Sequence, residues 1–257
     1  MVSGHAALPA SEQAGSGFGL SPPDARLEDN MSITLRQRIR ALVPKPIYNA
    51  QLIARRAPRW EQAGIIFVHV PKNGGTSLNT ALYGRFMGHY SVRELQRHVP
   101  ERFKRLPSFA LTRNPWSRAL SAYRFVCAGD QMTAGPKILN PGRYQIPAFE
   151  SFERFILEWL PAQDLRTADF VFRTQENFVR DRNGNMGVSF LGRLEDPAGY
   201  GTFLEETLGR KLDIPYINRT SATSEPDTGY RKSYSSEMRD MVARLYADDL
   251  DLASYDF

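Results

Sequence analysis

A charged residue, two glycines and two hydroxyl residues follow one another in the stretch VPKNGGTSL, which continues the apolar run IIFVHV. A buried strand, a glycine-rich turn and a helix start form an anion site, because unpaired backbone N–H groups and the positive end of the helix dipole converge there. A lysine adds a mobile charge, and hydroxyls add hydrogen-bond donors. The alternative is a tight turn with a surface lysine. The residues of this loop are Lys72, Gly74, Gly75, Thr76 and Ser77.

A second pair of anion-binding side chains stands in TRNPWSRALSAYRF, residues 112–125. Arg113 ends the apolar run SFALT, and Ser121 lies about two helical turns further on. A strand end and the face of the following helix can converge on one anion, with a planar guanidinium fork and a hydroxyl donor. Arg118 and Arg124, in the same helix, are predicted to be solvated charges.

Two common nucleotide-binding motifs are missing from the chain. The P-loop of nucleotide triphosphatases has its lysine after the glycines, in the pattern G-x-x-x-x-G-K-[ST], whereas here the lysine comes before them. The dinucleotide fingerprint G-x-G-x-x-G does not occur either. The usual patterns therefore indicate neither a nucleoside triphosphate nor a dinucleotide as the ligand.

Strands alternate with helices along the chain. IIFVHV and SFALT predict buried parallel strands, each followed by a helix: TSLNTALYG, which Gly84 ends, and a second helix that Asn114 caps and Pro115 begins. Residues 128–150 are a Gly/Pro-rich excursion of the kind that forms functional loops. This order predicts an α/β fold with a largely parallel sheet. Further predicted elements are a helix SFERFILEWL, strands FVFR and VSFLGR, and helices near residues 197–208 and 235–247.

Length and composition divide the chain into a tail, a lead-in and a folded remainder. The 257 residues are 42% hydrophobic and 24% charged, which suits one or two globular domains. Residues 1–30 are rich in Gly, Ser, Pro and Ala and are predicted to be disordered, with Met31 as an alternative first residue. Residues 31–62 predict a basic helical lead-in, and residues 63–257 the main domain. The single cysteine, Cys127, excludes an internal disulfide and a cysteine-rich metal site.

The charge balance favours acidic partners. The formal net charge is +5 and the pI is near 9.4, which suits nucleotides, anionic glycans, nucleic acid or membrane surfaces without choosing among them. No apolar stretch approaches the ~20 residues of a membrane helix, and the first residues lack a secretory pattern, so a cytoplasmic location is predicted. The basic lead-in is a solvated face or a peripheral contact with a membrane surface or polyanion.

HVPKNGGTSL followed by TRNPWSRALSAYRF resembles the paired cofactor loops of sulfotransferases that use 3′-phosphoadenosine 5′-phosphosulfate (PAPS). The nearer likeness is to the branch of bacterial and Golgi carbohydrate sulfotransferases, heparan sulfate 2-O-sulfotransferase among them. FRTQENFV, VSFLGRLED and the stretch from INRTS to the final YDF follow in the same order, so that the resemblance covers about Ile65 to Phe257. It implies a P-loop-like, three-layer fold and metal-free transfer of a sulfuryl group from PAPS to a carbohydrate hydroxyl, with no nucleic-acid partner.

The resemblance also implies roles for matching residues. The loop from Lys72 to Ser77 would bind the 5′-phosphosulfate, and Arg113 with Ser121 the 3′-phosphate that distinguishes PAPS from ordinary adenine nucleotides. Five residues would close a C-terminal loop over the cofactor: Arg219, Thr220, Ser221, Tyr230 and Arg231. The chain departs from the usual threonine, aliphatic residue and aspartate at Asn73, Thr112 and Ser117, and none of these changes removes a charge that the cofactor needs.

Sulfuryl transfer needs charge stabilisation on the leaving oxygen and a base for the acceptor proton. Lys72 is predicted to supply the first. His5 lies in the predicted tail, and His69 in a buried strand suggests a core or loop-supporting role. His89, after Gly88, lies where related carbohydrate sulfotransferases present a histidine to the acceptor, and it is the predicted base; the alternatives are His98, Glu94 and Glu176. A nearby basic cluster predicts a solvated helix or a groove for an anionic glycan: Arg85, Arg93, Arg97, Arg102, Lys104 and Arg105.

Two functions of other classes stay open at this point. A nucleotide-dependent kinase or phosphotransferase with a divergent loop would need a triphosphate and magnesium, but the chain lacks the expected lysine position and an evident metal-holding aspartate after a strand. A catalytically inactive nucleotide-binding module that keeps the loops would be favoured if His89 were remote from Lys72.

Overall fold

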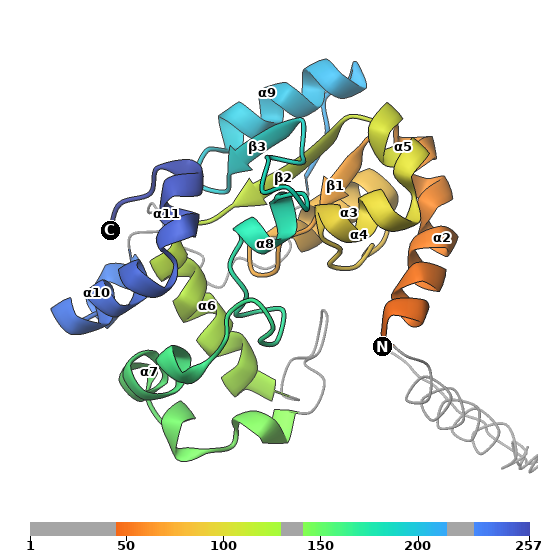
Figure 1. Cartoon of the computed structure of the whole chain (residues 1–257). Coiled ribbons are helices and arrows are strands. Elements are labelled where there is room, and N and C mark those ends of the chain that lie inside the picture. The colour runs from red at the N-terminus through yellow and green to blue at the C-terminus, as the bar shows by residue number, and fades with distance from the viewer. Residues whose placement is uncertain (1–44, 130–140, 215–228) are drawn as a thin grey trace, which may run out of the picture. The chain divides into compact units, whose positions relative to one another are not determined.

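The computed structural model describes residues 45–129, 141–214 and 229–257 (Figure 1). Residues from Ala50 to Phe257 form one compact unit, and the chain up to Asn49 belongs to another. The predicted disordered tail, the alternative start at Met31, and the three loop residues Arg219, Thr220 and Ser221 lie outside the described residues. The described end of the basic lead-in is helical, as predicted, in α2 (Lys45–Ala63).

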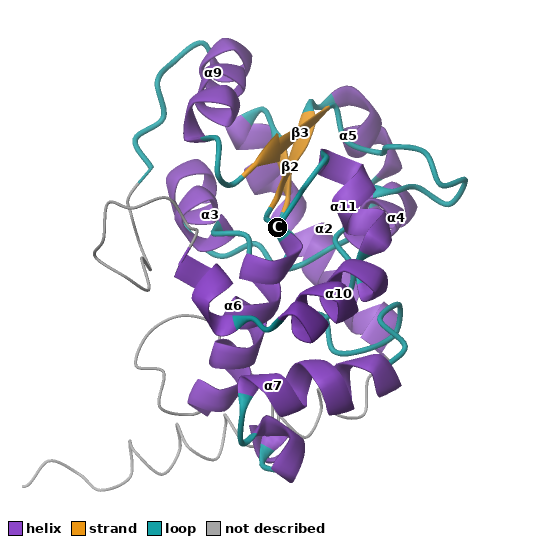
Figure 2. Cartoon of the chain, turned by 90° about the vertical axis from the view of Figure 1, so that its left-hand side faces the viewer, coloured by secondary structure: helices purple, strands orange, loops and turns teal. Residues whose placement is uncertain are grey.

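Three parallel strands form the sheet, in the order β1-β2-β3. They are β1 (Ile66–Val68), β2 (Ser108–Thr112) and β3 (Phe190–Arg193). Every residue of β1 and β2 is buried, as continuous apolar runs predict for strands of a covered parallel sheet. Helices flank the strands, with α3 and α9 to the left of them in Figure 2 and α4 and α5 to the right. The predicted α/β fold is confirmed.

Helices follow each strand at the ends where site residues were expected. α3 (Gly75–Tyr83) follows β1 and ends at Gly84, whereas α6 (Pro115–Ala128) follows β2 and is capped by the Asn114 side chain, which accepts hydrogen bonds from two backbone N–H groups. Both starts agree with the sequence. The other helices are α4 (Val92–His98), α5 (Pro100–Arg105), α8 (Glu176–Val179), α9 (Pro197–Leu208), α10 (Ser236–Leu245) and α11 (Ala247–Ala253).

Two of the predicted elements differ in the structure. The run FVFR, residues 170–173, forms turns instead of a strand, because Val171 and Phe172 pack into an apolar cluster with Phe155. Periodicity cannot separate a short buried turn from a short strand. SFERFILEWL is helical but divided into α7 (Phe152–Arg154), a π-helical turn η4 (Phe155–Trp159) and a 3₁₀ turn η5 (Leu160–Ala162).

Two apolar clusters form the core of the unit. The first surrounds the sheet and includes side chains of α3, α4 and α9, whereas the second joins α6 to η4, η5 and α10. Buried polar residues lie between these clusters, among them Asn73 in the loop after β1, Arg118 on α6 and Gln175 just before α8. The candidate site therefore lies along this polar seam.

Candidate active site

The loop between β1 and α3 has a backbone that only certain residues adopt. Lys72 has φ +71° and Gly74 has φ +68°, both in the left-handed region that disfavours side chains. A Cβ on Gly75 would lie 2.2 Å from the Cδ2 atom of His69, so the loop approaches that ring as closely as a glycine allows. A non-glycine residue held at positive φ is uncommon and occurs often at functional sites. The loop therefore holds Lys72 in place at the start of α3.

Positive charge accumulates around Lys72. Its ammonium lies 4.1 Å from the centre of the Phe125 ring, and no ion pair to a carboxylate is found for it within the described residues. Burial first, and then the charges of Arg113 and Arg118, lower the pKa of Lys72 to about 8. Three cations that disfavour one another's charge are stabilised when an anion binds among them. The seam thus has the electrostatics of an anion site.

Arg113 connects the second anion-binding segment to the first. Its guanidinium donates to the Ser117 hydroxyl from Nε (3.0 Å) and Nη2 (2.7 Å), and its Nη1 donates to the backbone oxygen of Lys72 (3.2 Å). Ser121 is half-buried on α6, one turn beyond Ser117. Both hydroxyl groups therefore lie on the face of α6 that the Arg113 guanidinium contacts. The structure thereby brings together Arg113 and the lysine loop, which the sequence separates.

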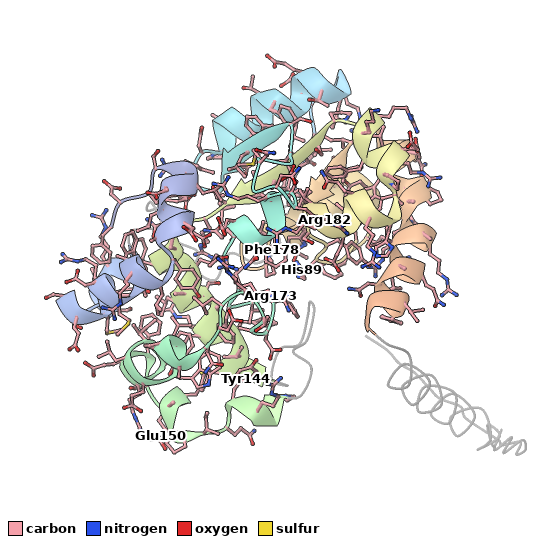
Figure 3. The ribbon with its side chains drawn as sticks, viewed as in Figure 1. His89, Tyr144, Glu150, Arg173, Phe178 and Arg182 are labelled. Atoms are coloured by element: carbon pink, nitrogen blue, oxygen red, sulfur yellow. The ribbon has the colours of Figure 1, made fainter. Side chains whose placement is uncertain are left out.

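His89 has the protonation pattern that a general base needs. Its Nδ1 lies 2.9 Å from the backbone oxygen of His69, and because a carbonyl only accepts, Nδ1 donates and Nε2 keeps its lone pair. The half-buried ring, labelled in Figure 3, stacks on that of Phe170, and the ring centres are 5.0 Å apart. Burial first, together with the charges of Lys72 and Arg118, lowers the pKa of His89 to about 4. His89 therefore lies within electrostatic range of Lys72.

His69 supports both groups from the end of β1. Asn79 accepts the Met87 N–H at Oδ1 (3.1 Å), so its Nδ2 is the donor that lies 3.0 Å from His69 Nδ1. Nδ1 of His69 accordingly accepts, and Nε2 bears the proton. Burial, His89 and Lys72 hold the pKa of His69 well below its usual value, which keeps the ring neutral. His69 is thus a buried, loop-supporting residue, as its place in the strand predicts.

The alternative bases are engaged elsewhere. Glu94 completes a capping box with Ser91 at the start of α4, and the carboxylate of Glu176 lies 3.1 Å from Arg180. His98 lines a separate cavity of about 410 Å³ together with Glu61 of α2 and residues of α5. His89, in contrast, bonds to the residue three positions before Lys72.

The prediction for Arg118 is wrong. It is buried on α6, where Nε donates to the backbone oxygen of Pro71 (3.1 Å) and Nη2 to that of Val171 (3.4 Å). Helical spacing alone does not say which side of α6 packs on the lysine loop. Within the basic cluster, Arg102 and Arg105 both bind Glu61, so these two positive charges share one carboxylate.

Two residues of the predicted C-terminal closure lie in the 3₁₀ turn η6 (Gly229–Ser233). Tyr230 is buried with its ring 5.7 Å from that of Phe257, and Arg231 is exposed and donates from Nη2 to the backbone oxygen of Phe257 (2.6 Å). Both therefore contact the last residues of the chain, which pack on the start of α6 through Trp116. Their role toward a cofactor stays a prediction.

Sequence reasoning missed Gln175 and Asp249, both buried in the polar seam. Gln175 bonds to both anion-binding segments, and the Asp249 carboxylate accepts from the Gln175 N–H. The sequence offered one signal, the motif FRTQENFV, which contains this glutamine. Nothing in the sequence pointed to Asp249, because it stands among other acidic residues of a helix.

The parallel sheet, the glycine loop between β1 and α3, and the cations around it are the features of an α/β protein with a candidate anion site at the ends of its strands. A model of the sulfotransferase family matches residues 59–256. The chain therefore belongs to the sulfotransferase family, whose members are enzymes that transfer a sulfuryl group. A comparison with curated protein sequences finds no match.

Within residues 45–129, 141–214 and 229–257, no group of three or more His, Cys, Asp or Glu side chains is arranged to hold a metal ion. In the same part of the chain, none of the helices combines the length and the apolar character that crossing a membrane requires.

Proposed function

We propose that the enzyme transfers the sulfuryl group of PAPS to a hydroxyl group of a carbohydrate. The observation that carries this proposal is the contact between the two anion-binding segments, in which Arg113 donates to the backbone of Lys72. A nucleotide with a phosphate on each side of its ribose needs two cationic sites held at a set spacing. The lysine loop suits the 5′-phosphosulfate and Arg113 with Ser121 the 3′-phosphate.

The residues present fit such a donor. Gly75 leaves no room for a side chain beside the α3 N-terminus, and Lys72 keeps a charge that no carboxylate neutralises within the described residues. Thr76 and Ser77 add hydroxyl groups in the first turn of α3. PAPS supplies a sulfuryl group on a good leaving group, and backbone N–H groups with Lys72 neutralise the charge that grows on the leaving oxygen.

His89 serves as the base in this proposal. Its unprotonated Nε2 accepts the proton of the acceptor hydroxyl, while Nδ1–H stays bonded to the His69 carbonyl and holds the ring's orientation. The half-buried rings of Phe86 and Phe170 flank His89, with ring centres 5.2 and 5.0 Å away, and offer apolar surface beside the base. A sugar ring, with apolar faces and hydroxyl edges, suits such a surface. The family resemblance supports the same acceptor class.

Calorimetry with two nucleotides tests the donor. We expect 3′,5′-adenosine bisphosphate to bind far more tightly than 5′-AMP, and Arg113→Ala to reduce that preference by about tenfold or more, because a charge-assisted hydrogen bond is lost. Arg124→Ala, which removes an exposed charge from the helix that follows Arg113, is the matched control and should leave the preference unchanged. Equal affinity of the wild type for the two nucleotides would contradict the PAPS assignment.

A transfer assay tests the reaction and the acceptor. Sulfur-labelled PAPS is incubated with the enzyme and a panel of neutral and anionic glycans, and label should appear in a glycan. A parallel reaction with γ-labelled ATP and magnesium should transfer nothing. Label transfer from ATP, with none from PAPS, would favour the phosphotransferase alternative.

A further inference from the structure

Gln175 extends the sheet beyond the end of β2. It lies just before α8 and is completely buried. Its side-chain Oε1 accepts the backbone N–H of Arg113 (2.9 Å), and its Nε2 donates to the backbone oxygen of the same residue (2.8 Å). A neighbouring strand would make this pair of bonds with its own backbone. Because both polar groups of the Arg113 backbone are taken, the amide fixes the residue that carries the guanidinium.

The same amide also binds the lysine loop. Oε1 of Gln175 accepts a second hydrogen bond from Nδ2 of Asn73 (2.7 Å), and that Nδ2 also donates to the backbone oxygen of Leu111 (2.7 Å). Asn73 directly follows Lys72 and is completely buried. One side chain therefore links the residue after Lys72 to the backbone of Arg113.

The backbone of Gln175 is itself anchored. The Asp249 carboxylate on α11 accepts the N–H of Gln175 (2.7 Å) and that of Glu176 (3.0 Å). A side chain whose backbone is fixed in this way loses little additional entropy when its amide makes three bonds. The backbone from which the amide extends is therefore anchored by α11, outside the two segments that the amide joins.

We propose that Gln175 is a positioning residue that sets the spacing between the lysine loop and Arg113, so that the enzyme binds both ends of the sulfuryl donor at once. The proposal rests on the proposed function, because it assigns one segment to each phosphate. Gln175 acts through Arg113 and Asn73: each hydrogen bond found for its amide goes to one of these two residues. A binding site loses selectivity when its supporting contacts let a ligand-binding group shift by a fraction of its hydrogen-bond length.

Gln175→Met tests the proposal, because methionine has a similar length and no amide. We expect the preference for 3′,5′-adenosine bisphosphate over 5′-AMP to fall by about tenfold or more, with a smaller change in 5′-AMP affinity. Gln163→Met is the matched control: the side-chain amide of that glutamine donates to the Trp159 backbone in η4, and its loss should leave the preference unchanged. A purely structural role would lower the melting temperature of Gln175→Met and spare the nucleotide preference.

A double variant identifies the route of the effect. If Gln175 acts through the Arg113 side chain, Gln175→Met should change the nucleotide preference of Arg113→Ala very little, since the two losses are not additive. Asn73→Ala removes the hydrogen bond between the lysine loop and Gln175 and should lower the same nucleotide preference. This variant tests the proposal if Gln175→Met does not fold. Wild-type preference in either folded single variant, or fully additive losses in the double variant, would overturn the proposal. A wild type without any preference would overturn the proposed function instead.

Discussion

Burial lowers the pKa of both His89 and Lys72, but with opposite consequences for their charge near neutral pH. A His89 pKa near 4 leaves the imidazole neutral and able to accept a proton. A Lys72 pKa near 8 leaves the ammonium mostly charged, with a proton that is held less firmly than in water. The charge of Arg118 contributes to both shifts, so an anion bound beside these cations would raise both pKa values. The protonation of His89 and that of Lys72 thus both depend on the charge of the bound ligand.

Removing the imidazole tests the base. His89→Ala should lower turnover by roughly 10²–10⁴, the usual contribution of a general base, and leave donor affinity nearly unchanged. Because the pKa of the free enzyme is near 4, the wild-type kcat/KM should stay level on the acid side until well below the ordinary histidine range, and then fall. A pH profile of glycan sulfation measures both effects.

His98→Ala is the matched control for that experiment, since His98 ends α4 beside a separate cavity. It should keep wild-type turnover. If His89→Ala retains most of its turnover, or loses donor binding instead, His89 is not the base.

Lys72 should make donor binding depend on pH. Its lowered pKa means that the free enzyme loses this charge as pH rises through about 8, so the affinity for 3′,5′-adenosine bisphosphate should weaken from neutral pH to about pH 9. Lys72→Met should bind the nucleotide more weakly at neutral pH and lack that decline. Titration calorimetry at several pH values measures it, and an equal decline in both proteins would assign the effect to another group.

Residues in contiguous motifs were predictable, and residues that act across the fold were not. Lys72 and Arg113 stand at strand ends beside recognisable glycine, asparagine and proline signals, and the structure places them in contact. Arg118 was predicted to be solvated because its helix position does not reveal what packs on it. Gln175 lies 62 residues from Arg113 along the chain, and only the folded structure shows that its amide completes the end of β2.

At the scale of elements, the start of α3 depends on the contact between Gly75 and His69. The ring of His69 lies where a Cβ at position 75 would be, with a separation of 2.2 Å to Cδ2. Its orientation is fixed by Asn79, so the ring cannot turn aside without breaking that bond. A displacement of the loop would therefore also displace the α3 N-terminus and both histidines, His69 and His89.

Gly75→Ala should displace that ring and disturb the whole loop. We expect a loss of roughly 1–3 kcal/mol in the free energy of unfolding, as for overpacking, with weaker nucleotide binding. Gly201→Ala is the matched control: it lies inside α9, nothing is within 4 Å of its added Cβ, and alanine should stabilise the helix by roughly 0.5–1 kcal/mol. Urea unfolding measures both, and a Gly75→Ala protein as stable as the control would refute the steric argument.

Elements with a complete set of local signals were predictable to the residue. β2 and α9 have the predicted bounds, because an apolar β-branched or aromatic run and a capped helix with a closing glycine leave little choice. FVFR had the apolar signal alone, and its side chains fill the second cluster from a turn. The predicted helix over residues 235–247 ends at Leu245, and α11 begins two residues later.

At the scale of the compact unit, the site lies where two apolar clusters meet, and buried polar groups connect them. Arg118, on α6, reaches the backbone after β1, and Asp249, on α11, caps the start of α8. Burial raises the pKa of Asp249 to about 6, although the charge of Arg118 opposes this rise. The buried charges of the seam create the electrostatic potential of the site. Each of them destabilises the fold when its partner is removed.

Asp249→Ala tests whether this seam also stabilises the unit. The change leaves the N–H groups of Gln175 and Glu176 without their acceptor and removes the negative charge that acts on buried Arg118, so the free energy of unfolding should fall by roughly 3–5 kcal/mol. Asp248→Ala, at the exposed neighbouring position, should stay within about 0.5 kcal/mol of the wild type.

The difference in unfolding free energy between the wild type and Asp249→Ala should also depend on pH, which is a second test. Because the folded-state pKa of Asp249 is raised, its protonation stabilises the fold: this contribution is complete below the unfolded pKa near 4 and is lost as pH rises through about 6. The gap in unfolding free energy between the wild type and Asp249→Ala should therefore widen as pH falls from about 7 to 5. Urea unfolding at those two pH values measures it. A gap that narrows toward acid would mean that Arg118 outweighs burial and lowers the carboxyl pKa, which would make Asp249 a permanently ionised partner of the anion site's cations.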